Sequence, residues 1–387
     1  MADATLVVGY AETPVTFASG RTAYDLGGEA YAQLLQRTGI DQERIDGFCA
    51  TAALSEGSNP FHAAYMSEML GLEVNWLNIA SIGGASFLQG VGSAMQALQT
   101  GQCEVAVVVG ADAPSTDNLT RYRGYRDEFQ VPTGLVRPPG AFALLQSAYT
   151  ANHGKPDDAL AKLVVEQRSR ALKNPHTVEK LRKPLTLDDY HQSRIIAPPL
   201  RLLDSVMFCD GANAVMLMQE RTASRLGISQ AVRIAAYAER SNHGIAQAIQ
   251  PMWHSGFDYV GQRVMQQSGL SPDRIEMLQL YDDFTIALLL QLEQLGFCGE
   301  GQGRSFVLST DFSSQSGLPL NTGGGQLSVG QPGLASGGLT MVEAVRQLLD
   351  DAGDRQAKHA NNCLVTGIGG IAYARNWIMS NAMVLTR

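Results

Sequence analysis

The chain repeats itself, and this duplication constrains its fold more than any other feature. The segment YAQLLQRTGIDQERIDGFCAT, from Tyr31, matches VGQRVMQQSGLSPDRIEMLQLYDD, from Val260. Each segment reads as a helix, a glycine, a short polar turn ending in Arg-Ile, and then a strand. Gly39 pairs with Gly269 in this comparison, and a glycine after a helix suits the left-handed C-cap position. The repeat therefore predicts two similar units.

A second pair of matching segments follows the first pair in the same order. GGASFLQGVGSAMQALQTGQCEVAVVVGAD begins at Gly83, and GGLTMVEAVRQLLDDAGDRQAKHANNCLVTGIGG begins at Gly337. Each has a glycine-rich start, a long helix and a short strand. The apolar runs Val105–Val109 and Cys363–Thr366 are typical of strands that are covered on both faces. These patterns predict an α/β chain with helices between the strands.

The matches divide the chain into an N-terminal half, residues 1–225, and a C-terminal half, residues 226–387. Between the repeated parts lies a stretch at about 116–203 that is rich in charge, proline and tyrosine. A long insertion of this kind is typical of a cap or loop region that contacts the substrate. We therefore expect it to lie near the functional site.

Composition and charge exclude several classes of protein. The chain has 387 residues, of which 45% are hydrophobic, and a formal net charge of -8. This length suits a large core, and the acidic balance argues against nucleic-acid binding. The sequence shows neither a bilayer-spanning stretch nor a signal peptide, so we expect a cytoplasmic protein with no membrane contact. The five cysteines form no CxxC pair and no histidines have zinc-ligand spacing, so no metal site is expected.

The stretch QLYDDFT places three ionisable residues between an apolar run, Ile275–Leu280, and a helical run, Phe284–Leu295. Because side chains alternate along a strand, Tyr281 and Asp283 are predicted to share one face and Asp282 the other. From the residues alone, Asp283 is an N-cap of the helix and Tyr281 is a core tyrosine with a satisfied hydroxyl.

Three stretches carry a resemblance to a known family: GLSPDRIEMLQLYDDFTIALLLQLEQLGFCGEGQG, NTGGGQLSVGQPGLASGG and TGIGGIAYARN. With the duplication, they make the chain similar to the thiolase superfamily, and above all to the sterol-carrier-protein-x and lipid-transfer-type thiolases. The resemblance implies a duplicated, five-layered αβαβα thiolase fold and a homodimer. It also implies acyl-coenzyme A chemistry between two central helices, with coenzyme A present as part of the substrate thioester and no permanently bound cofactor.

The catalytic residues of the family are replaced in this chain. Where the family has a nucleophilic cysteine at the start of the first central helix, SIGGASF has Gly84, or Gly83 if the match shifts by one residue. The cysteine that many thiolases use near the end corresponds to Gly367, and the family's Gly-His-Pro has Gln331 in its centre. Ser81 and Ser86 are candidate replacement nucleophiles, but a serine needs an adjacent base. A condensation through an acyl-cysteine is therefore not supported.

The resemblance favours a catalytic role for the QLYDDFT stretch. Tyr281 and Asp283 occupy the positions of the family's oxyanion-hole and acid/base side chains, while the N-cap interpretation of Asp283 stays open. A tyrosine and a carboxylate suit retro-aldol cleavage of a 3-hydroxyacyl-CoA, which leaves a ketone or aldehyde and a thioester enolate. The candidate catalytic residues are Tyr281, Asp283 and Gln331. The candidate backbone donors to the oxyanion are Gly84, Gly369 and Gly370, and the candidate substrate contacts are His243, Ser81 and Tyr373.

One branch of the family lacks the cysteine and cleaves steroid side-chain CoA thioesters together with a small OB-fold, zinc-ribbon partner. The resemblance implies such a partner here, in a heterotetramer. Two alternatives stay open: a thiolase or acyltransferase with a nucleophile other than cysteine, and a non-catalytic lipid- or acyl-CoA-binding subunit.

Overall fold

A computed structural model describes residues 3–57, 59–117, 127–135, 137–244, 251–372 and 376–387. The first half contains β1 (Thr5–Glu12), α1 (Ala23–Thr38), β2 (Gly47–Thr51), α2 (His62–Met69), β3 (Trp76–Ala80), α3 (Ser86–Gln99), β4 (Val105–Asp112), β7 (Gly211–Gln219) and α8 (Glu220–Arg225). The predicted insertion contains α4 (Asp127–Gln130), α5 (Arg137–His153), α6 (Asp157–Ala171), α7 (Leu187–Gln192), β5 (Ile195–Ala197) and β6 (Leu200–Arg201). The second half contains β8 (Val232–Ser241), α9 (Phe257–Ser268), β9 (Leu278–Gln279), α10 (Thr285–Gln294), α11 (Gly303–Ser309), α12 (Gly325–Val329), α13 (Gly337–Leu348), β10 (Asn362–Ile368), β11 (Ile371–Ala372), β12 (Asn376–Trp377) and β13 (Met379–Thr386).

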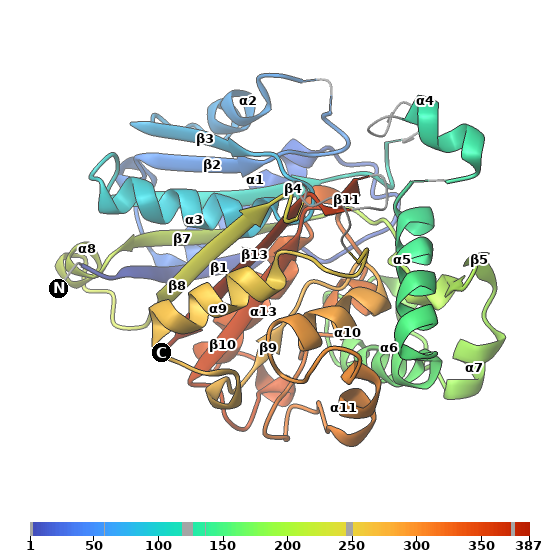
Figure 1. Cartoon of the computed structure of the whole chain (residues 1–387). Coiled ribbons are helices and arrows are strands. Elements are labelled where there is room, and N and C mark those ends of the chain that lie inside the picture. The colour runs from blue at the N-terminus through green and yellow to red at the C-terminus, as the bar shows by residue number, and fades with distance from the viewer. Residues whose placement is uncertain (1–2, 58, 118–126, 136, 245–250, 373–375) are drawn as a thin grey trace.

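A mixed nine-stranded sheet, in the order β3-β2-β4-β7-β1-β8-β13-β10-β9, runs through the centre of the molecule (Figure 1). The first five of these strands come from the first half of the chain and the last four from the second half. The two sets join where Leu6 and Val7 of β1 pair antiparallel with β8. The sheet is therefore continuous across the duplication.

The predicted repeat is present in the order of the elements. The series β1-α1-β2 and then α3-β4-β7 has its counterpart in β8-α9-β9 and then α13-β10-β13. Gly39 ends α1 with φ 63°, Gly269 ends α9 with φ 70°, and both glycines are left-handed C-caps as predicted. The boundary between residues 225 and 226 stays a prediction, and it falls in the connection from α8 to β8.

Three buried cores define the layers. In the middle core, α3 and α13 pack together against strands of both sets. In a second core, α1 covers the outer face of the first set, and in a third, α9 and α10 cover the outer face of the second set. Neighbouring residues of one strand serve opposite layers, since Val108 of β4 lies in the middle core and Val107 in the outer one. The two sets of strands, although joined at β1 and β8, thus lie on either side of α3 and α13 and form two sheet layers. The order helix, sheet, helices, sheet, helix is the predicted five-layered αβαβα fold.

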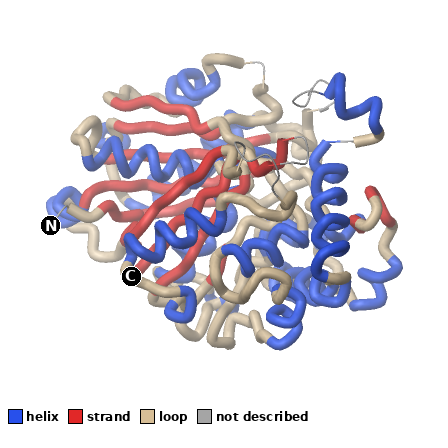
Figure 2. Tube along the Cα trace, in the orientation of Figure 1, coloured by secondary structure: helices blue, strands red, loops and turns tan. Residues whose placement is uncertain are grey.

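The insertion covers the second half of the chain. Helices α5, α6 and α7 lie together beyond one end of the sheet (Figure 1), in a region that is almost entirely helix and loop (Figure 2). Phe142 of α5 stacks on Phe284 with 4.1 Å between the ring centroids, and Gln167 of α6 donates to Asp282 at 2.6 Å. The insertion thus reaches the QLYDDFT stretch. Its longest helix, α5, has 17 residues, and no helix in the described part of the chain is long and apolar enough to cross a membrane.

Candidate active site

The QLYDDFT stretch is held by side chains more than by strand pairing. The strand predicted over Ile275–Leu280 is shorter in the structure, where β9 has two residues. Asn321 takes over the pairing: its Oδ1 accepts from the Leu280 N–H at 2.8 Å, and its Nδ2 donates to the Leu280 carbonyl at 3.0 Å. Thr366 of β10 then accepts from the Tyr281 N–H at 2.9 Å. These bonds fix the backbone of Tyr281 at the sheet edge.

The Tyr281 hydroxyl points into the interior between the two halves. Its oxygen lies 2.9 Å from Ser336 Oγ, where either group can donate, and it accepts from Gln331 Nε2 at 3.3 Å. The residue is 2% exposed. Burial and the charge of Asp283 raise the pKa of Tyr281 well above its usual value of 10. Tyr281 is therefore a neutral phenol at physiological pH, and so a hydrogen-bond donor.

The position of Tyr281 requires a residue without a side chain at position 84, which is Gly84. A β-carbon built on Gly84 would lie 1.9 Å from the Tyr281 oxygen, far inside van der Waals contact. The phenol thus occupies the space that a side chain at position 84 would fill. A tyrosine at position 281 in this orientation therefore excludes a side chain at position 84.

Two helix N-termini meet beside the Tyr281 oxygen. The turn before α3 contains Gly83, with φ +63°, and Gly84. A β-carbon on Gly337, the first residue of α13, would lie 2.7 Å from the Gly84 carbonyl oxygen, so the start of α13 touches this turn. Helix N-termini carry partial positive charge and free N–H groups. The arrangement favours negative charge that develops at this point.

Asp282 and Asp283 have different roles. Asp282 accepts from the N–H groups of Gln326 and Leu327 at 2.9 and 3.2 Å, so it caps α12 and has a structural role. Asp283 makes no cap, because α10 has Phe284 at its N-cap position and no side-chain bond there, so the N-cap interpretation is wrong. Asp283 Oδ1 is buried and has no hydrogen-bond partner among the residues that the structure describes. Burial and the charge of Asp282 raise the pKa of Asp283 to about 8.

Gln331 lies in the site as a donor to Tyr281. Its backbone bonds to both Met207 and Cys209, at 2.9 and 2.8 Å, which ties the loop before α13 to the end of the insertion. Its Nε2 also contacts Gln326 Oε1 at 3.3 Å. The side chain is 5% exposed. The structure thus brings Gln331, Tyr281 and Gly84 together.

The glycines of TGIGG were predicted to donate to the oxyanion, and they lie against the turn that contains Gly83 and Gly84. A β-carbon on Gly83 would lie 2.3 Å from the Gly369 carbonyl oxygen, so the two turns are in backbone contact. The Gly369 N–H donates to the Met379 carbonyl at 2.8 Å, so its prediction as an oxyanion donor is wrong in this structure. Gly370 has φ +111°, and its carbonyl accepts from Ile378. Its N–H stays a predicted donor.

The alternative nucleophiles do not fit. Ser86 is buried, donates to the Gly83 carbonyl at 2.6 Å and accepts from the Ile82 N–H at 2.9 Å, so it holds the turn. Ser81 is exposed, and its substrate contact stays a prediction. Burial raises the pKa of four cysteine thiols to about 12, namely those of Cys49, Cys103, Cys209 and Cys298. It raises the pKa of the Cys363 thiol well above its usual value. These shifts oppose thiolate formation.

Two predicted substrate contacts lie away from this centre or outside the described residues. His243 Nε2 lies 3.6 Å from Asp258 Oδ1 of α9, and its neighbour Asn242 donates to the Ile378 carbonyl at 2.9 Å. The His243 loop therefore lies beside Ile378, whose N–H donates to the Gly370 carbonyl, and the substrate contact of His243 stays a prediction. Tyr373 lies outside the described residues.

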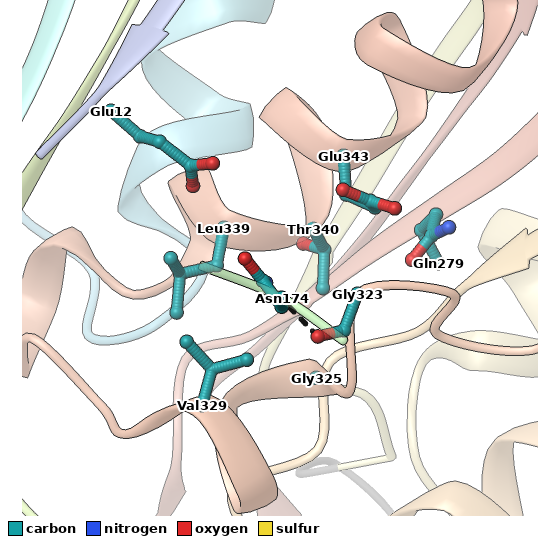
Figure 3. Close-up of a pocket in the computed structure, with 9 residues that line it drawn as sticks. All are labelled: Glu12, Asn174, Gln279, Gly323, Gly325, Val329, Leu339, Thr340 and Glu343. Carbon is teal, nitrogen blue, oxygen red and sulfur yellow. Dashed lines mark hydrogen bonds between the residues drawn. The ribbon is translucent and has the colours of Figure 1, made fainter. Parts of the chain in front are cut away.

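A small cavity lined by both polar and apolar residues lies near the site (Figure 3). Its volume is about 20 Å³, which suits roughly one water molecule and no acyl thioester. Gln279 precedes Tyr281 by two residues, and Thr340 follows Ser336 by one turn of α13. Glu343 in its wall binds Arg346 at 2.8 Å and Arg355 at 2.5 Å. The lining residues are Glu12, Asn174, Gln279, Gly323, Gly325, Val329, Leu339, Thr340 and Glu343.

Sequence reasoning missed Ser336, Thr366 and Asn321. Each is a common polar residue in a glycine-rich or apolar context, and nothing in the local pattern marks it. Their roles come from bonds to a segment 40 to 85 residues away in the chain. Only the packing of β9, β10 and α13 brings them to Tyr281.

The fold and the site define an α/β enzyme architecture in which two duplicated halves meet at a buried polar centre. Residues 5–154 match the family model described as Thiolase, N-terminal domain, and residues 238–381 match Thiolase C-terminal domain-like. The chain belongs to the thiolase superfamily.

Two bacterial relatives cover most of the chain. The first is 17-hydroxy-3-oxo-4-pregnene-20-carboxyl-CoA lyase of Mycobacterium tuberculosis, 29% identical over 86% of this chain and 89% of the relative. The second is the steroid side-chain-cleaving aldolase of Thermomonospora curvata, 28% identical over 95% of this chain and 96% of the relative. A solved structure, the Ltp2-ChsH2(DUF35) aldolase, superposes with a TM-score of 0.87 at 26% identity and covers 99% of this chain and 97% of that chain.

Proposed function

We propose that this protein is a CoA-dependent carbon–carbon lyase that cleaves a 3-hydroxyacyl-CoA by a retro-aldol reaction. The observation that carries the proposal is the Tyr281 oxygen, which fills the place of a side chain at Gly84 beside the starts of α3 and α13. The names of the two bacterial relatives and of the solved aldolase support the same reaction class.

Asp283 is the base in this proposal. Its pKa of about 8 leaves a useful fraction of carboxylate at neutral pH, and its Oδ1 has no competing partner in the described part of the chain. The carboxylate takes the proton of the substrate 3-hydroxyl. The electron pair of that O–H bond forms the new carbonyl, the C2–C3 bond breaks, and its electron pair moves into the thioester as an enolate. A ketone or aldehyde then leaves.

Tyr281 is the acid. As a neutral phenol it donates its proton to C2 of the enolate, which yields the shortened acyl-CoA and a phenolate. Backbone N–H groups at the starts of α3 and α13 favour the enolate charge before this step. On product release, the proton held by Asp283 returns through solvent to Tyr281. The cycle consumes no free coenzyme A and needs no covalent acyl-enzyme.

The substrate and the partner are proposed from the relatives. Their names point to a steroid side chain carried as a CoA thioester. The solved aldolase carries two component names, Ltp2 and ChsH2(DUF35), which supports a partner subunit. The OB-fold and zinc ribbon of that partner and the heterotetramer stay predictions. The cytoplasm stays the predicted location.

The structure also favours the predicted homodimer. The edge strand β3 pairs with β2 alone among the described strands, and it exposes Leu77 (46%) and Ile79 (42%). The preceding α2 region exposes Phe61 and Met69. An unpaired, apolar strand edge invites a further strand, and a second copy supplies one by symmetry. Ile79→Lys is therefore expected to yield monomer in light scattering, whereas an unchanged mass would oppose this interface.

Product analysis by mass spectrometry tests the function. The protein is incubated with 3-hydroxyacyl-CoAs and 3-ketoacyl-CoAs, with and without coenzyme A and a DUF35-type partner. A short acyl-CoA plus a ketone or aldehyde, formed without added coenzyme A, is the expected result. Cleavage of 3-ketoacyl-CoA that depends on coenzyme A would instead establish a thiolase, and no turnover of either class would favour the non-catalytic subunit.

Tyr281→Phe separates chemistry from packing. It removes the proposed acid and keeps the ring, so turnover is expected to fall by about 100-fold or more. Tyr149→Phe is the matched control: Tyr149 is equally buried and donates to Glu293 at 2.5 Å, away from Gly84. Full turnover by the Tyr281 variant would refute the assignment.

A further inference from the structure

Ser336 lies at the centre of the site, and the sequence analysis gave it no role. We propose that Ser336 is a positioning residue that donates a hydrogen bond to the Tyr281 oxygen, directs the phenolic proton away from itself and stabilises the phenolate left after proton transfer. The inference deepens the proposed lyase function and rests on it.

The contacts of the Tyr281 oxygen carry the first step of the argument. A phenol oxygen has one proton and two acceptor positions. Gln331 Nε2 is a donor and takes one of these positions at 3.3 Å. If the Ser336 hydroxyl donates at 2.9 Å, it takes the other. The phenolic O–H then points in the remaining direction, free of both side chains and available to the reacting carbon.

Ser336 is not used as a structural residue of its helix. It stands immediately before α13, where serine usually caps the helix by accepting from a backbone N–H. Here its backbone is already helical, with φ -60° and ψ -30°, and its side chain makes no cap bond. The residue is fully buried. Among the described residues, the hydroxyl has Tyr281 as its side-chain partner.

The chemistry of the phenolate supplies the second step. After the Tyr281 proton moves to C2, its O–H bond is broken and the oxygen carries a full negative charge. Burial and the carboxylate of Asp283 oppose that charge, whereas hydrogen bonds from Ser336 and Gln331 favour it. A donor to a charged group is about twice as effective as a donor to a neutral one. Ser336 therefore acts mainly when Tyr281 is ionised, which is a transition-state effect.

Ser336→Ala removes the hydroxyl and almost no volume. We expect kcat to fall by about tenfold to a hundredfold with KM nearly unchanged, because the lost bond strengthens only as charge develops. A fall confined to KM, or no change in either constant, would overturn the proposal.

Thr340→Val is the matched control. Thr340 is buried one turn further along α13, and its hydroxyl donates to the Gly337 carbonyl at 3.0 Å. The change also removes one buried hydroxyl from this helix, but from a residue that makes no hydrogen bond to Tyr281. It is expected to affect stability and to leave kcat within about twofold. An equal loss of kcat in both variants would mean that Ser336 matters only through helix packing.

A second readout does not depend on turnover. Protein grown with tyrosine carrying ¹³C at the ζ carbon gives one resonance per tyrosine, and Tyr281→Phe identifies the resonance of Tyr281. Ser336→Ala is expected to shift this resonance, and Thr340→Val is not. An unmoved resonance in Ser336→Ala would refute the bond. If the wild-type protein cleaves no thioester, the lyase proposal fails by itself, and the catalytic role of Ser336 fails with it even where the resonance shifts.

Discussion

Gly84→Ala tests the central contact of the site with a single methyl group. In the structure, the new β-carbon would lie 1.9 Å from the Tyr281 oxygen and 2.1 Å from Cζ. Ordinary contact begins near 3.4 Å, so the ring must retreat by about 1.5 Å. That movement breaks the bonds from the Tyr281 oxygen to Ser336 and Gln331.

The magnitude follows from these losses. Overpacking a rigid core costs about 1–3 kcal/mol, and each lost neutral hydrogen bond about 1 kcal/mol. Gly84→Ala is therefore expected to lower the free energy of unfolding by roughly 3–5 kcal/mol. Because a misplacement of about 1 Å reduces turnover by about 100-fold, lyase activity should fall at least that far. Urea unfolding and product formation measure the two effects.

A double-mutant cycle identifies the cause. With Tyr281→Ala in the background, the clash is gone, and Gly84→Ala should then cost less than about 0.5 kcal/mol. Gly28→Ala, in α1, is the control: apart from the neighbouring residues and the backbone of α1 itself, no heavy atom of the described residues lies within 4 Å of the new β-carbon, so stability should rise by up to about 1 kcal/mol. If Gly84→Ala costs the same with and without the Tyr281 ring, the contact on which the proposed function depends is refuted.

Two further predictions concern ionisation. Because the pKa of Asp283 is raised to about 8, the folded protein holds a proton on this group that the unfolded chain releases near pH 4. The stability that Asp283 contributes is thus full below about pH 4 and is lost as pH rises to about 8. Asp283→Asn should remove this pH dependence from the free energy of unfolding measured in urea. The same variant should also abolish the rise of kcat with pH over the same range. Burial raises the pKa of Glu343, but Arg346 and Arg355 more than offset it and lower the pKa to about 2, so the stability from Glu343 is present above about pH 4.5 and is lost as pH falls to about 2. Glu343→Gln leaves both guanidinium groups without this buried partner and should lower the free energy of unfolding by about 3–5 kcal/mol at pH 7. Glu220→Gln, at an exposed pair with Arg233, is the control and should lower it by less than about 1 kcal/mol in the same assay.

Several features of the site were predictable because they depend on local backbone geometry. Asp282 pointed away from Tyr281 as the alternation of side chains required, and it binds the start of α12. The charge of Asp283 acts on Tyr281 more strongly than that of Asp282, in agreement with a shared face. The N-cap interpretation of Asp283 was wrong because the chain stays extended through Phe284, which places the carboxylate one residue too early to cap α10.

The glycines show where local reasoning ends. The amide of Gly369 was a plausible oxyanion donor from its motif, but antiparallel pairing beside β13 already satisfies it. Nothing near Gly369 in the sequence reveals that partner, because Met379 belongs to the strand that returns along the sheet.

By itself, the sequence determined the duplication and the helix ends at Gly39 and Gly269, which follow from periodicity and from the conformational freedom of glycine. The five-layered fold and the lack of the nucleophilic cysteine at position 84 followed from the resemblance to the thiolase superfamily. Only the tertiary structure decided that the oxygen of Tyr281 fills the space above Gly84 and that Ser336 holds it there. Residues 84, 281 and 336 are far apart in the chain, and they meet because α3 and α13 share one core between the two halves of the sheet.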